Sequence, residues 1–404
     1  MTNSANSITE LKNLNLRDEF FGCINTINSL WSSFTFKVRS DWNVKIGLPN
    51  KFVSPNNKIF KEDQFYWDTY FTILGLVVSD RIELARGMVE NLFYLLERFG
   101  VIPLRNRYYN LGLSQPPFLS SMVFEIFDKT RDKNWLKKGL SYAEKELLTF
   151  WCSRPPLPEH KLAYRGLSRY CDHFICHATA EHESGWDSTS RFYDRCLDFL
   201  PVDLNACLYK YEKDLSRGYN LLGNPARAKK YAARAARRKK AVMDLMWDPE
   251  KGFFFDYDYT NQIRSTFYSL AGFYPLWAGM LDEHTATRVV KKLSLFEFKG
   301  GLANTARRSL RKPFRQWDYP NGWPGQQWIV IKGLINYGFF DRARRLGYKW
   351  LNLNRRVFQK TGKFWEKYDV IDCAPGKSGR YPTQSGFAWT NSVFLRLIHD
   401  LEEL

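Results

Sequence analysis

The sequence contains no apolar stretch long enough to cross a membrane, and its first residues lack the basic and then apolar segments of a secretory signal. It also lacks the P-loop and the dinucleotide fingerprint that hold phosphates in nucleotide-dependent enzymes. Its 7 cysteines are odd in number and form no Cys-x-x-Cys pair, which argues against a disulfide framework. We therefore expect a cytoplasmic protein that uses no cofactor and does not enter a membrane.

Internal boundaries are also missing. No proline-, glycine- or serine-rich linker and no low-complexity tract divides the 404 residues. A chain of this length can hold one large domain or a few smaller ones. Residues 1–20 are polar and are predicted to form a mobile arm or an outer helix. We expect residues 21–404 to form a single domain with a large core.

Acidic residues are scarce relative to basic ones, because 42 Asp and Glu stand against 60 Lys and Arg, a formal net charge of +18. The densest basic run, residues 227–240, contains no acid and has alanine at regular intervals. Pro225 stands where a first helical turn favours proline, so the pattern predicts one helix over residues 225–246. A solvated helix face explains this charge. Binding to an anionic surface is the alternative, and no nucleic-acid-binding motif accompanies the run.

Helical periodicity recurs along the chain as apolar residues at three- and four-residue spacing. The stretches that show it are 81–99, 203–222, 225–246, 285–295, 326–337, 341–352 and 387–402. Loops rich in Pro, Gly and Trp separate them, and residues 252–258 are predicted to form a short extended piece. Helices that alternate with long loops favour an all-α toroid of six helical hairpins in two concentric rings, with few strands.

Aromatic residues are abundant, at 17% of the chain with 14 Trp, and several of them flank carboxylates. Aromatic faces stack on the apolar C–H faces of sugars. Glycosidic bonds are cleaved by two carboxyl groups, one that protonates the leaving oxygen and one that activates water or attacks carbon. Both features occur together in residues 183–187 (Glu-Ser-Gly-Trp-Asp), 316–324 (Gln-Trp-Asp-Tyr-Pro-Asn-Gly-Trp-Pro) and 366–369 (Glu-Lys-Tyr-Asp).

These three segments resemble the signatures of the trehalases, glycoside hydrolase family 37. Residues 316–324 match the family's Q-W-D-x-P-x-G-W-P signature throughout, and the other two match its E-S-G-W-D and E-K-Y-D motifs. The resemblance implies an (α/α)6 barrel and an inverting α-glycosidase that hydrolyses the disaccharide trehalose to glucose. It also implies that Asp187 is the general acid and Glu366 the general base. Further matches, in family order, lie at 65–71, 102–103, 114–117, 166–170 and 386–391.

Sugar-contact residues are expected in the same motifs, where Trp faces stack on pyranose rings and Asp or Gln side chains bond hydroxyls. The alternative for each Trp is core packing, for Asp318 bracing of its loop, and for Arg107 an outward orientation. Asp187 could instead cap a helix, and Glu366 could pair with Lys367 at the surface. The expected contact residues are Trp67, Asp68, Arg107, Gln115, Arg169, Gly185, Trp186, Trp317, Asp318 and Trp323.

The sequence departs from the family pattern at positions that are expected to bind the substrate. Ile59 and Leu113 stand where the family has Arg, and Arg380 stands where it has Glu. An aliphatic side chain cannot reproduce the bidentate hydrogen bonds of a guanidinium. These departures leave open another α-linked glucoside, a charged aglycone, or a catalytically weak sugar-binding protein. The basic side chains that could replace the lost cations are Lys58, Lys61 and Arg107.

A group of histidines lies near the acid motif. His173 and His177 are spaced as two zinc ligands on a helix would be, and His182 follows. No H-E-x-x-H motif occurs, and hydrolysis by two carboxyl groups needs no metal. We therefore expect these histidines to lie at the edge of the cavity without binding a metal.

Overall fold

The structure, a computed structural model, describes residues 15–309 and 313–404. Helices dominate these residues, and each strand is only two or three residues long, in agreement with the predicted low strand content. The first fourteen residues of the predicted arm lie outside the described residues, and its end carries the short helix α2 (Leu16–Glu19). Within the described ranges, no helix has both the length and the apolar character needed to cross a membrane.

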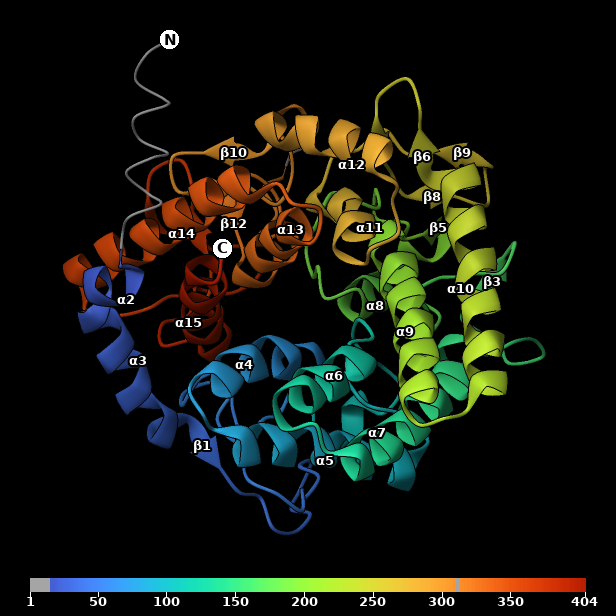
Figure 1. The fold of residues 1–404 in the computed structure, drawn as a ribbon, viewed down its shortest axis with the longest axis horizontal. Helices are drawn as coiled ribbons and strands as arrows, with labels where there is room; N and C mark the ends of the chain where they lie inside the picture. Colours follow the sequence, from blue (N-terminus) through green and yellow to red (C-terminus); the bar gives the residue numbers. More distant parts are fainter. Residues whose placement is uncertain (1–14, 310–312) are drawn as a thin grey trace.

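An inner ring of helices encloses the centre of the molecule (Figure 1). Each of its helices packs against the next, and the last, α15, packs against α4 and closes the ring. Every residue of α4 except Val78 is buried, as a helix with neighbours on all sides requires. The ring consists of α4 (Tyr66–Val78), α6 (Leu119–Thr130), α9 (Val202–Leu221), α11 (Tyr274–Trp277), α13 (Pro324–Asn336) and α15 (Ala388–Glu402).

An outer ring of helices surrounds the inner one (Figure 1). Each of its helices carries both buried and exposed residues. It consists of α3 (Phe21–Phe34), α5 (Ile82–Phe99), α7 (Lys133–Glu146), α10 (Pro225–Met246), α12 (Glu283–Val290) and α14 (Phe340–Thr361). Local signals set the bounds of these helices. The Asn224 side chain accepts a hydrogen bond from the backbone N–H of Arg227 at the start of α10, and Gly100 ends α5 at φ +75°. The two rings form the predicted (α/α)6 barrel.

The predicted helices are present with modest shifts at their ends. Stretch 285–295 divides into α12 and a 3-10 turn over Lys291–Leu295, and stretch 341–352 extends to Thr361 in α14. The predicted basic helix is α10. The periodicity analysis did not identify α3, α4, α6, α7, the short α8 (His177–Glu183) or α11. The extended piece at 252–258 contains two short strands, β7 (Phe253–Phe254) and β8 (Tyr257–Asp258).

Short strands join loops that are far apart in the sequence. In the three-stranded sheet β12–β13–β14, Asn321 pairs with Asp369 and Gly322 with Tyr368, so residues 316–324 lie beside residues 366–369. Its strands are β12 (Asn321–Gly322), β13 (Tyr368–Asp369) and β14 (Ala374–Pro375). The other strands are β1 (Thr35–Phe36), β2 (Phe52–Val53), β3 (Leu162–Tyr164), β4 (Leu167–Ser168), β5 (Phe199–Leu200), β6 (Trp247–Asp248), β9 (Ile263–Arg264), β10 (Glu297–Phe298) and β11 (Gly301–Leu302).

Candidate active site

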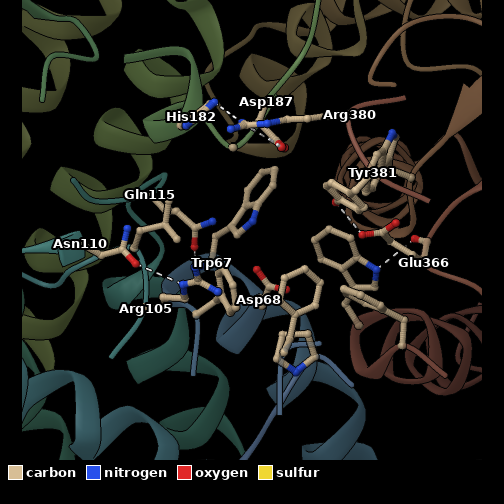
Figure 2. A pocket seen from close by; sticks show the side chains of 18 of the residues that line it. Trp67, Asp68, Arg105, Asn110, Gln115, His182, Asp187, Glu366, Arg380 and Tyr381 are labelled. Carbon is tan, nitrogen blue, oxygen red and sulfur yellow. Dashed lines mark hydrogen bonds and ion pairs between the residues drawn. The ribbon is translucent and has the colours of Figure 1, made fainter. Parts of the chain in front are cut away.

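A cavity of about 390 Å³ opens where the loops of the inner ring meet (Figure 2). Its size is in the range of small-molecule sites. Asp187 and Glu366, from motifs 179 residues apart in the sequence, both line it, and Figure 2 shows them on different sides of the space. Eight of the predicted site residues line this cavity: Trp67, Asp68, Gln115, Gly185, Asp187, Trp317, Trp323 and Glu366.

Tryptophan rings form one wall of the cavity. Trp317 and Trp323 stack with their ring centroids 3.9 Å apart and their planes 2° apart. Trp67, near the start of α4, lies 5.5 Å from Trp317, and Trp389 meets Trp323 edge-on at 5.6 Å. All four side chains are nearly buried, and each still contributes to the cavity lining. These four rings therefore pack against one another and also line the cavity. The wall they form is a rigid aromatic surface of the kind that sugars stack on.

Gly185 allows the acid motif to approach this wall. Its φ is +76°, and a Cβ atom at this position would lie 2.6 Å from the Trp67 ring. A larger residue would meet both a strained backbone conformation and a steric overlap. Gln115, from the loop before α6, holds the backbone at Trp67, because its Oε1 accepts a hydrogen bond from the Trp67 backbone N–H at 3.1 Å.

The Asp187 carboxyl group is held by the residues of the Q-W-D motif. Trp317 Nε1 donates to Oδ1 at 3.0 Å, and Gln316 Nε2 donates to Oδ2 at 3.1 Å. These bonds orient the carboxyl group toward the cavity, where 27% of the side chain is exposed. Burial raises the pKa of Asp187 to about 7, although the Trp317 hydrogen bond and the positive charge of Arg380 lower it. Asp187 therefore holds a proton in a large share of molecules near neutral pH.

Arg380 and His182 lie beside Asp187 at the rim (Figure 2). The guanidinium Nη1 of Arg380 is 3.9 Å from Asp187 Oδ2 and also contacts His182 Nε2. Burial, together with Arg380, lowers the pKa of His182 to about 4, so this histidine is neutral at pH 7. The described residues contain no group of His, Cys, Asp and Glu side chains placed to hold a metal ion.

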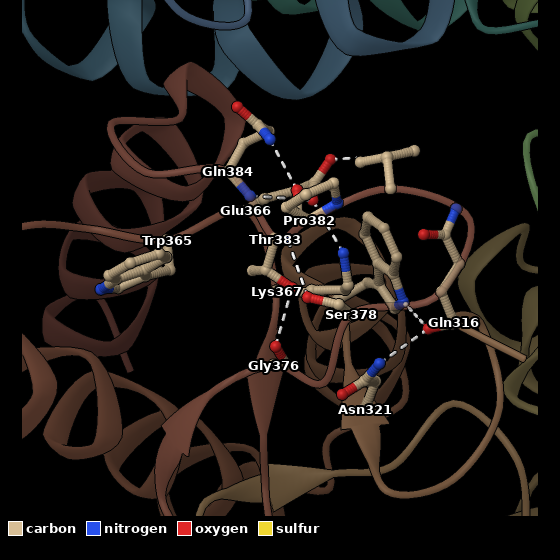
Figure 3. Close-up of polar contacts among 12 residues, drawn as sticks. Gln316, Asn321, Trp365, Glu366, Lys367, Gly376, Ser378, Pro382, Thr383 and Gln384 are labelled. Carbon is tan, nitrogen blue, oxygen red and sulfur yellow. Dashed lines mark hydrogen bonds and ion pairs between the residues drawn. The ribbon is translucent and has the colours of Figure 1, made fainter. Parts of the chain in front are cut away.

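Glu366 lies in a different environment, shown in Figure 3. The Tyr381 hydroxyl donates to its Oε1 at 2.7 Å, and Lys367 Nζ donates to its Oε2 at 2.8 Å. The pairing with Lys367 that the sequence suggested is present, but both side chains are buried and not at the surface. The Lys367 ammonium also lies over the Trp323 ring at 4.8 Å. The Lys367 ammonium, 2.8 Å from Glu366 Oε2, stabilises negative charge on the Glu366 carboxylate.

Asp68 is a third carboxyl group on the cavity, one position after Trp67 in α4. Burial, with the nearby charges of Glu366 and Asp187, raises its pKa to about 8. A protonated Asp68 offers both a hydrogen-bond donor and an acceptor to a sugar hydroxyl. Three carboxyl groups around one apolar space, two of them with raised pKa values, are typical of a functional site.

Two predicted contact residues lie behind the cavity wall. Trp186 is fully buried and packs under the Arg191 guanidinium at 5.0 Å, and it does not line the cavity. Asp318 braces its loop, as the alternative interpretation held. It accepts hydrogen bonds from the Thr189 hydroxyl at 2.8 Å and the Ser190 backbone N–H at 3.1 Å. Both residues therefore support the segment that follows Asp187, and neither reaches a ligand in the cavity.

The two arginines predicted as contacts also lie away from the cavity lining. Arg107 pairs with the buried Asp63 at 2.6 Å. Arg169 donates to the Tyr259 hydroxyl at 2.7 Å and to the Leu197 carbonyl at 3.4 Å. Both guanidinium groups are engaged by these protein partners, and neither is part of the cavity lining. The motif match located the segments correctly but did not determine the direction of the side chains.

The positive charge in the cavity comes from residues that the motifs did not identify as sugar contacts. Arg105 and Arg380 line it, and Ile59 and Leu113 line it as aliphatic side chains. Arg105 is positioned by Asn110 at 3.1 Å and by Asp63 at 2.9 Å. Neither of the suggested lysine replacements is in the lining, since Lys58 bonds Ser385 Oγ and Lys61 lies over the Phe36 ring. No sequence signal separated Arg105 from the many other basic residues.

Comparison with known proteins identifies the family of this chain. The family described as Trehalase matches this chain over residues 10–173 and 169–402. The chain belongs to the trehalase family. A cytosolic neutral trehalase from Beauveria bassiana is 32% identical over 86% of this chain and 58% of its own length. A periplasmic trehalase from Citrobacter koseri is 32% identical over 92% of this chain and 72% of its own length.

The fold of a solved family member agrees with this assignment. The neutral trehalase Nth1 from Saccharomyces cerevisiae superposes with a TM-score of 0.77 at 28% identity, over 87% of this chain and 75% of that chain. The present chain spans little more than half the length of the cytosolic trehalase from Beauveria bassiana. It contains the barrel and both carboxylate motifs of the trehalase family.

Proposed function

We propose that this chain is an inverting α-glycosidase that hydrolyses trehalose to two glucose molecules, with Asp187 as general acid and Glu366 as general base. The observation that carries the proposal is the contrast between the two carboxyl groups on one tryptophan-walled cavity. Asp187 has a pKa raised to about 7 by burial, whereas Glu366 is paired with an ammonium group. Two carboxyl groups with different environments are what acid and base roles require.

Asp187 would protonate the glycosidic oxygen as the bond to the anomeric carbon breaks. Its oxygens are oriented by Trp317 and Gln316, so the proton donor has a fixed direction toward the cavity. A general acid works best when its pKa is near the working pH, so the pKa of Asp187, about 7, suits catalysis near neutral pH. After transfer, Asp187 becomes a carboxylate, and the positive charge of Arg380 at 3.9 Å favours that state.

Glu366 would take a proton from the water that attacks the anomeric carbon on the face opposite to the leaving oxygen. Attack from that face inverts the configuration at this carbon. Tyr381 and Lys367 hold the carboxylate in place and supply its counter-charge. The stacked rings of Trp317 and Trp323 and the Trp67 ring would bind the sugar faces, and Asp68 and Gln115 would bond hydroxyls.

A second candidate keeps this mechanism and changes the aglycone. Arg105 and Arg380 line the cavity, while aliphatic Ile59 and Leu113 occupy positions where the family pattern has Arg. Arg380 lies beside Asp187, the side on which the leaving group is protonated. A guanidinium there would favour a leaving group that carries a carboxylate or another anion.

A panel assay separates the two candidates. The purified chain is incubated with trehalose, with other neutral α-glucosides and with α-glucosides of anionic aglycones, and glucose release is measured. Glu366→Gln is the matched control, because it removes the charge and keeps the side-chain shape. Release from trehalose that disappears in the control supports the first candidate. Release from only an anionic glucoside supports the second, and glucose release that Glu366→Gln does not reduce refutes both.

We infer a cytoplasmic location for the protein, as the sequence predicts. All seven cysteines are free thiols, which suits a reducing compartment. The named relatives include both cytosolic and periplasmic trehalases, so they favour neither compartment. Fractionation of cells that express the protein at its natural level tests this inference.

A further inference from the structure

A second hollow, of about 180 Å³, lies on the outer rim of the barrel beside helix α10. Strand β3 and helix α10, which both contribute to it, are neighbours at this rim in Figure 1. It shares no lining residue with the active-site cavity. Its charged lining residues are Arg154, Arg165, Glu212, Arg234, Arg237 and Arg238. Five guanidinium groups therefore surround one carboxylate.

The single carboxylate, Glu212, is already matched by one arginine. Arg238 donates to it through Nε at 3.1 Å and Nη2 at 3.0 Å, and both side chains are buried. This bidentate pair neutralises one positive and one negative charge at the base of the hollow. Four guanidinium groups remain around the same space.

These four arginines have few acceptors. Arg154 and Arg237 have no hydrogen bond or ion pair within the part of the chain that the structure describes. Arg234 has a buried Nε without a hydrogen bond, 3.5 Å from Glu212, and its Nη2 contacts only the Cys152 sulfur, at 3.1 Å.

Arg165 lies 3.4 Å from Asp244, and Lys240 shares that carboxylate at 3.0 Å. The acceptor capacity around the hollow is therefore well below its donor capacity.

We propose that this hollow binds the phosphate group of a small phosphomonoester. Like charges gathered in a concave space repel one another, and an anion with several oxygens relieves that repulsion. A phosphomonoester carries close to two negative charges at pH 7 and three acceptor oxygens, which suits several guanidinium forks. The volume of about 180 Å³ leaves room for a small organic group beside the phosphate.

A small ligand fits this surface better than a nucleic-acid strand does. The uncompensated guanidinium groups converge on one hollow, and the outward face of α10 next to it presents alanines at 232, 233 and 236. Binding of an extended strand requires a track of phosphate contacts with aromatic or base-reading residues, and α10 carries no such motif. Within the basic run, Arg234, Arg237 and Arg238 therefore line the hollow, whereas Lys229 and Lys240 are exposed to solvent outside it.

Calorimetric titration of the whole chain tests the proposal, with glycerol phosphate and inorganic phosphate as probes at constant ionic strength. We expect saturable one-to-one binding, tighter for glycerol phosphate. Arg154→Ala with Arg237→Ala should weaken it about tenfold or more, because charged hydrogen bonds to phosphate are lost. Both side chains are exposed, so the variant should retain the wild-type melting temperature.

The matched control is Lys213→Ala with Lys229→Ala, two exposed cations of α9 and α10 outside the hollow, and it should bind like the wild type. Arg237→Glu provides a second test with one substitution, and it should also weaken binding. The proposal is overturned by an absence of saturable binding, by equal losses in both double variants, or by binding of inorganic phosphate alone. A single-stranded oligonucleotide that binds more tightly and is weakened equally by both double variants would also overturn it.

Discussion

Removal of Arg380 should move the alkaline limb of the pH–rate profile to higher pH. As the proposed general acid, Asp187 must hold its proton, so we expect kcat/KM to fall as pH rises through its pKa of about 7. The positive charge of Arg380 lowers that pKa. Arg380→Ala removes the charge, the pKa of Asp187 rises, and the enzyme keeps its active form to higher pH.

The magnitude follows from the geometry. Two unit charges separated by the observed 3.9 Å interact by about 1 kcal/mol in water and about 4 kcal/mol at an effective dielectric constant of 20. The Arg380 side chain is 51% exposed, so solvent screening places the interaction in the lower part of this range. Since about 1.4 kcal/mol corresponds to one pKa unit, we expect the alkaline limb to move up by about one unit.

The assay is kcat/KM for the preferred glycoside measured from pH 5 to pH 10. Lys229→Ala, which removes an equal charge far from the cavity, is the control and should leave the limb in place. Contacts of Arg380 with the substrate would change the height of the profile, whereas the shift in pKa changes its position. An alkaline limb that stays at the same pH or moves to lower pH in Arg380→Ala would refute the electrostatic argument.

Three further predictions concern catalysis and stability. Asp187→Asn and Glu366→Gln should each lower kcat by about 10²- to 10⁴-fold, and near-normal rates in either variant would refute its assigned role. Asp187→Asn should keep the wild-type melting temperature, whereas Glu366→Gln should lower it, because the buried Lys367 ammonium loses its carboxylate. Gly185→Ala should lower the free energy of unfolding, measured by urea denaturation, by about 3 kcal/mol. Gly100→Ala should lower it by only about 1 kcal/mol, because Gly100 has a similar positive φ but open space around it. Arg191→Met should cost about 3–5 kcal/mol in the same assay, because it leaves two buried carboxylates unpaired, and a neutral result would contradict this account.

Helices with a clear apolar period were the most predictable part of the fold, and they include four outer helices, α5, α10, α12 and α14. Helix α10 has a Pro at its first turn and an Asn before it, and its start was predicted at the correct residue. Helix α4 was not predicted from periodicity, because all but one of its residues are buried and no polar face interrupts the apolar ones. The other inner helices α9, α13 and α15 keep some partly exposed positions and were predicted, so the signal is lost only where burial is nearly complete.

The carboxylate pair was predictable because each residue lies in a long motif, and strands β12 and β13 bring two of these motifs together. The direction of individual side chains was less predictable. Trp186 and Arg169 lie in matching segments but point into packed regions with their own partners. Arg105 reaches the cavity through contacts with Asp63 and Asn110, and such tertiary contacts leave no pattern in a single sequence.

The stereochemistry of hydrolysis tests the central claim most directly. Proton NMR during the first minutes of trehalose cleavage distinguishes α-glucose from β-glucose before they equilibrate. A water molecule activated by Glu366 inverts one anomeric carbon and leaves the other unchanged, so equal initial amounts of α- and β-glucose are predicted. Release of α-glucose alone would show retention of configuration and contradict the assignment of Glu366 as a general base.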